Sequence, residues 1–174
     1  MKVLGIVGSL RKNSFNRSLM NAFVLQKPEG VEMQIADIGT LPYYNQDDES
    51  SMPESVQTLK TQIETADIII IATPEYNRSI PGVLKNALDW ISRPYGKNSL
   101  KGKRALVVGA STGPIGTAVA QYDLKKMLLV GDAQVFGQPE FFMGMAGSKF
   151  DADGNLTDTD TKGYIDNAWA RITA

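Results

Sequence analysis

The sequence has no histidine and no cysteine among its 174 residues. Without histidine, a Ser-His-Asp triad, histidine metal ligands and a histidine general base are all excluded. Without cysteine, thiol nucleophiles, redox dithiols and thiolate zinc sites are excluded as well. If this protein catalyses a demanding reaction, we therefore expect a bound cofactor to supply the reactive group.

Long apolar runs are also missing. The longest, Ile68–Ala72, is far too short to cross a bilayer. The first residues form a short apolar run broken by Gly5 and Gly8, which is unlike a signal peptide. The formal net charge is −1, so no excess of basic charge points to nucleic acid or to an anionic membrane. We expect a soluble, cytoplasmic protein with neither kind of partner.

The length and composition are those of one globular domain. A chain with 43% hydrophobic and 21% charged residues can build a full core, and we expect a single domain over residues 1–174. Runs rich in β-branched residues alternate with apolar stripes at helical spacing. We expect strands near residues 2–7, 31–36, 67–73, 104–109 and 133–136, and helices near residues 15–24, 53–66, 81–91, 117–130 and 161–172. This alternation predicts an α/β fold, a three-layer α/β/α sandwich around a five-stranded parallel sheet.

The first loop of this pattern has the character of an anion site. It covers Gly8–Ser18, between the first predicted strand and the first predicted helix. Ser9, Ser14 and Asn16 offer polar side chains there. The helix start adds backbone N–H groups and the positive end of the helix dipole, both of which favour an anion. Ser14 is also a candidate N-cap for the helix.

Three cations crowd the same helix start. Arg11, Lys12 and Arg17 stand where an isolated helix would favour acidic residues. Arg17 also takes the position at which a capping box would have Glu or Gln. A bound dianion would relieve this repulsion. We therefore favour a phosphate site over the alternative, a solvated basic turn.

Two further loops are expected beside this one. Ligands of parallel sheets bind outside the carboxyl ends of the strands, so the loops after strands one, three and four should meet at one cleft. These loops are residues 8–14, 73–80 and 110–116. Tyr76 offers a flat face, Asn77 offers hydrogen bonds to a polar heterocycle, and the small residues Ser111–Gly113 let a backbone approach closely. A phosphate site beside a planar-ring site describes a mononucleotide cleft.

Two long motifs resemble those of a known family. The strings GSLRKNSFN at residues 8–16 and PEYNRSIPGVLKNALDW at residues 74–90 are similar to motifs of the NAD(P)H-dependent FMN reductase family, and most of all to its chromate- and quinone-reductase branch. The resemblance spans the chain, including ASTG at residues 110–113 and PEF at residues 139–141. It implies a flavodoxin-like fold with strand order 2-1-3-4-5. It also implies non-covalently bound FMN and homodimers that often pair into homotetramers.

The resemblance also assigns cofactor-binding residues, all of them in or beside the three loops. It places the FMN phosphate on Ser9, Arg11, Ser14, Asn16 and Arg17. It places the isoalloxazine ring and ribityl chain on Pro74, Glu75, Tyr76 and Asn77, with Arg78 at the mouth and Ser111, Thr112 and Gly113 on the far side of the ring. Trp90 and the helix at residues 84–89 would be core and dimer contact rather than chemistry.

The resemblance implies a ping-pong reaction that the flavin carries. NAD(P)H would give a hydride to flavin N5 and leave, and an electron acceptor would then take its place. The acceptor stays open between a quinone, chromate, an azo or nitro compound and free flavin. Backbone N–H groups near the pyrimidine edge of the flavin would stabilise the reduced anion. With no histidine in the chain, we expect water to be the proton donor and assign no catalytic residue.

Arg78 departs from the habit of the branch, whose members often carry an aromatic or small residue after the Glu-Tyr-Asn triplet. An arginine at the mouth could bind the 2′-phosphate of NADPH or an anionic acceptor. A solvated loop charge is an equally good interpretation. The preference between NADH and NADPH therefore stays open.

Other functions fit the sequence less well. The main alternative is a flavodoxin-type electron carrier without its own NAD(P)H oxidation, but such carriers are typically strongly acidic and this chain has a net charge of −1. A Rossmann dehydrogenase needs G-x-G-x-x-G after the first strand, whereas Gly109, Gly113 and Gly116 follow the fourth. The acidic stretch 151–155 lacks the Gly and Glu positions of an EF-hand, so we expect a turn and no metal there.

Overall fold

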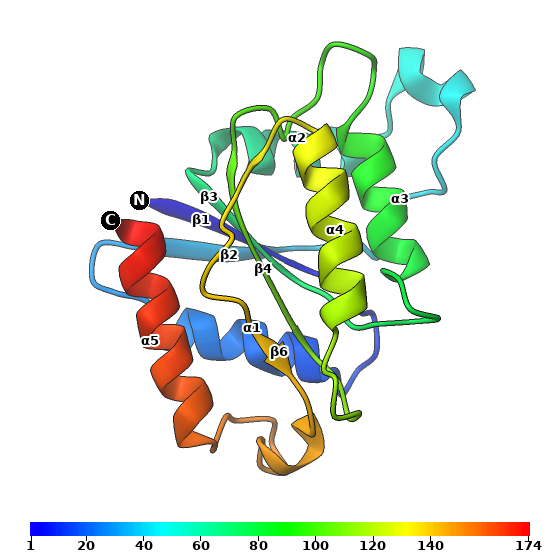
Figure 1. Cartoon of the computed structure of the whole chain (residues 1–174). Coiled ribbons are helices and arrows are strands. Elements are labelled where there is room, and N and C mark those ends of the chain that lie inside the picture. The colour runs from blue at the N-terminus through cyan, green and yellow to red at the C-terminus, as the bar shows by residue number, and fades with distance from the viewer.

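A computed structural model describes all residues, 1–174, and shows a sheet between two layers of helices (Figure 1). The strands are β1 (Lys2–Val7), β2 (Glu32–Ala36), β3 (Ile68–Ala72), β4 (Arg104–Ala110), β5 (Gln134–Val135) and β6 (Phe142–Met143). The α-helices are α1 (Phe15–Leu25), α2 (Glu54–Thr65), α3 (Gly82–Ile91), α4 (Ala118–Val130) and α5 (Thr159–Thr173). Two short 3₁₀ helices are η1 (Gln46–Ser51) and η2 (Ala146–Ser148). None of the helices combines the length and the apolar character that a membrane span requires.

The sheet is parallel and has the order β2-β1-β3-β4-β5, which confirms the predicted strand order and fold class. At its centre, Gly5 of β1 lies opposite Ile35 of β2 and Ile70 of β3. Every residue of β3 is buried, as expected for a central strand that helices cover on both faces. β2 forms one edge and carries exposed residues along its length.

Helices cover both faces of the sheet, so alternate residues of each strand enter different cores (Figure 1). Ile69 and Ile71 of β3 pack with side chains of α2, α3 and α4. Ile68 and Ile70 point the other way and pack with side chains of α1 and α5. Trp90 is fully buried, as predicted for a core residue.

Three helices begin where local signals in the sequence place them. Ser14 caps α1 as predicted, because its hydroxyl accepts a hydrogen bond from the N–H of Arg17 at 3.3 Å. α2 and α3 begin directly after Pro53 and Pro81, whose fixed φ suits a helix start. The start of α1 is the one that matters for the predicted phosphate site.

The start of α5 differs from the prediction, and the end of α4 differs from the usual glycine cap. α5 begins at Thr159 rather than near residue 161, because Asp158 caps it and accepts a hydrogen bond from Thr161 N at 3.0 Å. Gly131 follows the last residue of α4, but its φ of −75° is open to any residue. The N–H of Gly131 still makes a helical hydrogen bond, so the left-handed position falls one residue later, at Asp132 with φ 62°.

The segment between β2 and α2, for which no helix or strand is predicted, contains regular structure. It contains η1, and side chains of α3 bind the residues that immediately precede η1. The side-chain N–H groups of Trp90 and Asn86 both donate to the carbonyl of Pro42, at 2.8 and 2.9 Å. The amide oxygen of Asn86 accepts from the N–H of Tyr44 at 2.8 Å. The second long motif therefore needs its asparagine and tryptophan, which lie one turn apart on α3, to fix this segment.

β6 was not predicted from the sequence. It pairs in parallel with the carboxyl end of β4, where Gly109 lies opposite Phe142 and Ala110 opposite Met143. Two residues without a periodic pattern give no strand signal, so the sequence predicts no strand between residues 137 and 149. β6 extends the wall beside the third predicted loop.

Residues 151–155 form the predicted turn. Phe150 and Leu156 pair across its base. One carboxylate oxygen of Asp151 accepts the N–H groups of Asp153 and Asn155, at 3.0 and 2.8 Å. The aspartates thus serve the geometry of the turn.

Candidate functional site

The three predicted loops meet at the carboxyl edge of the sheet and enclose a pocket of about 150 Å³. Nine of the predicted site residues line it: Ser9, Arg11, Ser14, Asn16, Pro74, Glu75, Tyr76, Ser111 and Thr112. Phe15 and Ala110 also line it and were not predicted. Four predicted residues lie outside the lining: Arg17, Asn77, Arg78 and Gly113. The loops therefore converge as the strand pattern predicts.

Free hydrogen-bond donors gather at the start of α1. The hydroxyls of Ser9 and Ser14 are buried, and each accepts a backbone N–H, from Arg11 at 3.4 Å and from Arg17 at 3.3 Å. Neither hydroxyl donates to another protein group, and the N–H groups of Phe15 and Asn16 have no protein acceptor. Four donors at one helix N-terminus therefore remain available to a ligand.

The same helix start carries positive charge that the protein does not neutralise. None of the five ion pairs in the structure involves Arg11, Lys12 or Arg17. The first turn of α1 contains no acidic residue. The guanidinium of Arg11 lies over the ring of Phe15, 5.6 Å from its centroid, so it is held beside the pocket. These donors and cations together fit a phosphate dianion.

The side chain of Asn16 bonds to the protein, while its backbone N–H stays available for the predicted phosphate contact. Its side chain is buried, its amide nitrogen donates to the carbonyl of Ala110, and its amide oxygen accepts the N–H of Ala110, both at 2.9 Å. This pair of bonds joins the start of α1 to the end of β4. Because both polar atoms of the amide are engaged, Asn16 holds two of the three loops together.

The loop after β4 is also held by the segment that contains β6. Ser111 donates its N–H to Met143 at 2.9 Å and accepts the N–H of Ala146 at 3.0 Å. A side chain at Gly144 would bring its Cβ within 2.4 Å of the carbonyl oxygen of Pro114, so only glycine allows this approach. The unpredicted strand and the chain after it thus fix the shape of the third loop.

The loop after β3 makes a tight turn at Tyr76–Ser79. Tyr76 and Ser79 exchange two backbone hydrogen bonds of 3.0 Å. The two residues between them, Asn77 and Arg78, have positive φ values of 52° and 62°. Two central residues with positive φ are typical of a type I′ turn, in which asparagine is common but arginine is unusual. The side chain of Tyr76 is 53% exposed and lies at the rim of the pocket.

Glu75 does not present a free carboxylate to the pocket, although it lies in the lining as predicted. One oxygen accepts the N–H groups of Val119 and Ala120 at the start of α4, each at 3.1 Å. The other pairs with the guanidinium of Arg78 at 3.3 Å. No local pattern could indicate this contact, because the partners lie 44 and 45 residues further along the chain. Arg78 is thus engaged in an ion pair, although 69% of its side chain is exposed.

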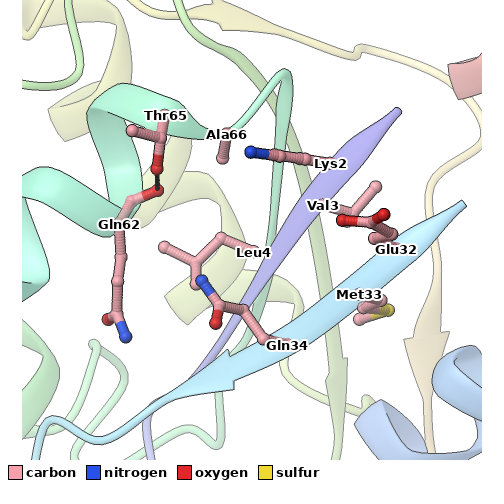
Figure 2. Close-up of a pocket in the computed structure, with 9 residues that line it drawn as sticks. All are labelled: Lys2, Val3, Leu4, Glu32, Met33, Gln34, Gln62, Thr65 and Ala66. Atoms are coloured by element: carbon pink, nitrogen blue, oxygen red, sulfur yellow. Dashed lines mark hydrogen bonds between the residues drawn. The ribbon is translucent and has the colours of Figure 1, made fainter.

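Other hollows of the surface lie away from these loops. One of about 290 Å³ lies beside the first residues of β1 and β2 and the end of α2. Figure 2 shows the residues that line it, among them Lys2, Gln34 and Gln62. Since β1 and β2 are parallel, this hollow lies at the opposite edge of the sheet from the pocket. A groove of about 450 Å³ lies between the ends of α3 and α4. Neither of these two hollows combines free donors at a helix start with unpaired cations.

The pocket is smaller than a whole nucleotide site. Its 150 Å³ compares with roughly 300–1,000 Å³ for the usual small-molecule site, so it can enclose the phosphate end of a mononucleotide but not the ring as well. Exposed apolar side chains lie on the same loops and on the chain after β6: Leu10, Tyr76, Ile115 and Met145. A planar ring would lie outside the pocket, against Tyr76 at its rim.

The comparisons with known proteins agree with this geometry. The family model described as NADPH-dependent FMN reductase matches residues 1–148. The chain is 44% identical to a 2-hydroxy-1,4-benzoquinone reductase of a Burkholderia species, over 98% of this chain and 97% of that protein. It is 38% identical to a quinone reductase of Escherichia coli K12, over 100% of this chain and 93% of that protein.

Solved structures give the same result. The flavoenzyme FerB of Paracoccus denitrificans, an NAD(P)H:(acceptor) oxidoreductase, superimposes with a TM-score of 0.90 at 43% identity, covering 99% of this chain and 97% of that one. An FMN-dependent NADH-azoreductase of Bacillus anthracis, with a TM-score of 0.66 at 14% identity over 99% of both chains, shares the fold. The protein is an oxidoreductase that uses FMN as its cofactor and NAD(P)H as its co-substrate. The chain thus belongs to the NADPH-dependent FMN reductase family.

Proposed function

We propose that this enzyme holds FMN at the pocket between the three loops and passes electrons from NAD(P)H to a quinone. The observation that supports this placement most strongly is the start of α1, where free donors lie beside cations without acidic partners. A phosphate dianion satisfies both at once. Once bound, FMN would supply the redox-active ring that the protein's own side chains lack.

In this proposal, the protein's own groups bind and orient. Ser9, Ser14 and Arg11, with the N–H groups of Phe15 and Asn16, hold the phosphate. The ring rests on the loop of Pro74 and Tyr76 and on the loop of Ser111, Thr112 and Gly113. Arg17, the third residue of α1, adds positive charge, and Asn77 and Arg78 border the open side. We assign no side chain as a proton donor.

A quinone is the acceptor that the rim of the pocket favours. The exposed side chains of Leu10, Tyr76, Ile115 and Met145 offer apolar contact to a flat, uncharged molecule. On the open side, Arg78 is paired with Glu75 and so offers less to an anion such as chromate. The names of the relatives, a benzoquinone reductase and a quinone reductase, support the same choice. Azo and nitro compounds, chromate and free flavin are the competing acceptors.

We also propose that two copies pair through the outer face of α4 and that the dimer works in the cytoplasm. α4 is apolar on both sides: Ala120, Leu124 and Leu128 are buried against the sheet. Tyr122, Leu129 and Val130 are exposed, Val130 to 87%. Exposed apolar side chains that lie together on one helix are typical of a protein–protein interface, so this face needs a partner. Pairing of such dimers would give a homotetramer.

Anaerobic reduction of the FMN-loaded protein tests the reaction. NADPH or NADH should bleach the flavin absorbance in stoichiometric amounts, and a benzoquinone should restore it faster than chromate or an azo dye at equal concentration. A protein that binds FMN but that neither nicotinamide reduces would behave as an electron carrier instead. Faster re-oxidation by chromate than by the quinone would contradict the proposed acceptor.

A further inference from the structure

α4 lacks a cap of its own. Thr117 stands at the N-cap position, but its side chain makes no capping bond, and its hydroxyl accepts the amide N–H of Gln121 at 2.9 Å instead. The first turn of α4 contains no acidic residue. The carboxylate of Glu75 supplies the missing acceptor, because it takes the N–H groups of Val119 and Ala120. The side chain of Glu75 is only 10% exposed, so this contact is largely shielded from water.

A second contact joins the same loop to the same helix. The hydroxyl of Ser79 donates to a carboxylate oxygen of Asp123 at 2.8 Å. The other oxygen of Asp123 accepts from the ammonium of Lys126 at 3.1 Å. The Ser79 hydrogen bond, followed by that of Lys126, lowers the pKa of Asp123, so this acceptor stays ionised near neutral pH. Asp123 lies one turn beyond Ala120, and the two contacts therefore run along one side of α4.

The two contacts flank the strained turn. Asn77 and Arg78, with their positive φ values, lie between Glu75 and Ser79. Asparagine adopts the left-handed region readily, but a residue such as Arg78 keeps this conformation where the surroundings impose it. Here α4 imposes the conformation, because it binds Glu75 just before the two residues and Ser79 just after them. The position of Tyr76 at the pocket rim thus depends on the attachment of this loop to α4.

We propose that Glu75 is a positioning residue for the reaction: by capping α4 it fixes the turn Tyr76–Ser79 and with it the surface on which the flavin ring rests. This inference rests on the proposed placement of FMN. Glu75 acts through its bonds to α4 and not by touching the reacting atoms. A glutamine at this position keeps an oxygen that can accept both N–H groups, whereas an alanine leaves them without a partner.

The test compares Glu75→Ala and Glu75→Gln with a matched control, Asp158→Ala. The control also removes a carboxylate that caps a helix, but that helix, α5, does not line the pocket. The readouts are the visible circular dichroism of bound FMN, FMN affinity by titration, kcat and KM for NADPH, and thermal unfolding without FMN. We expect Glu75→Ala to change the flavin dichroism, to weaken FMN binding about tenfold and to lower kcat, since small misplacements at a reacting centre are costly. Glu75→Gln should recover most of the flavin dichroism, the FMN affinity and kcat. Asp158→Ala should lower the thermal stability and leave these three properties unchanged.

Several results would overturn the inference. Flavin dichroism and kcat of Glu75→Ala that match the wild type would do so, as would a glutamine variant no better than the alanine variant, which would assign the effect to charge. If Glu75→Ala does not fold, Ser79→Ala carries the test, because it removes only the contact to Asp123 and should also change the flavin dichroism. Unchanged flavin dichroism in Ser79→Ala would also contradict the inference. A wild-type protein that binds no FMN would instead refute the proposed placement itself.

Discussion

Arg78 adopts a backbone conformation that suits few side chains. Its φ of 62° lies in the left-handed region, which costs a residue with a Cβ roughly 1–2 kcal/mol. Its ion pair with Glu75 is largely exposed and returns about 0–1 kcal/mol. Arg78→Gly should therefore raise the free energy of unfolding by about 0.5–1 kcal/mol in urea denaturation, whereas Arg78→Ala should give no gain. A glycine variant that is no more stable than the alanine variant would show that the turn is not strained there.

The charge of Arg78 gives a second prediction. If the guanidinium leaves Glu75 to bind the 2′-phosphate of NADPH, Arg78→Ala should raise KM for NADPH by up to about fivefold and leave KM for NADH almost unchanged. Steady-state kinetics with a saturating quinone measure both values in the same preparation. Equal changes for the two nicotinamides would leave Arg78 as a solvated loop charge.

The sequence could predict single residues only where their partners are local. Ser14 and Arg11 belong to a short stretch in which the helix start, the hydroxyls and the cations are visible together. Asn16 and Glu75 could be placed at the site but not given their roles. Their partners lie 94 and 44 residues further along the chain, and no local pattern indicates such a hydrogen bond. The fold alone brings them together.

Elements were predictable where their pattern is long and periodic. β3 and α3 carry continuous apolar signals and appear within one residue of the predicted bounds. β6 has two residues, and its pairing with β4 depends on a glycine-rich segment that has no periodicity. The location of the site followed from the sheet, because carboxyl ends of parallel strands share one edge. The shape of the third loop did not follow, since β6 determines it.

The start of α5 should make stability depend on pH. Asp158 caps this helix, and hydrogen bonds from Thr161, then from Lys149, lower its pKa from 3.8 to about 2. A carboxylate whose pKa is depressed by folding stabilises the protein fully above its unfolded-state pKa of about 3.9. This stabilisation is lost as the pH falls from about 4 to about 2.

Asp158→Asn tests this, because asparagine also caps a helix but does not titrate. The wild type should exceed the variant in free energy of unfolding by about 1–2 kcal/mol at about pH 6, and the difference should shrink toward zero at about pH 2. Urea denaturation over a pH series measures both proteins. A difference that stays constant over that range would show that the charge of Asp158 plays no part.

At the scale of the whole molecule, the exposed apolar face of α4 should decide the oligomeric state. Leu129→Asp combined with Val130→Asp places two charges on that face and should convert a dimer into monomers in sedimentation velocity. Leu25→Asp is the control, since Leu25 is similarly exposed but lies on α1, across the sheet from α4. Dissociation by the control variant, or none by the α4 variant, would place the interface elsewhere.

The central claim is that the start of α1 binds the phosphate of FMN, and riboflavin tests it most directly because it has the same ring without that phosphate. Titration of the flavin-free protein should show FMN binding at least about 100-fold more tightly than riboflavin, as expected for a dianion held by charged and neutral donors. Arg11→Ala should remove much of this preference, whereas Lys12→Ala, which does not line the pocket, should leave it nearly intact. Equal affinities of the wild type for FMN and riboflavin would contradict the account.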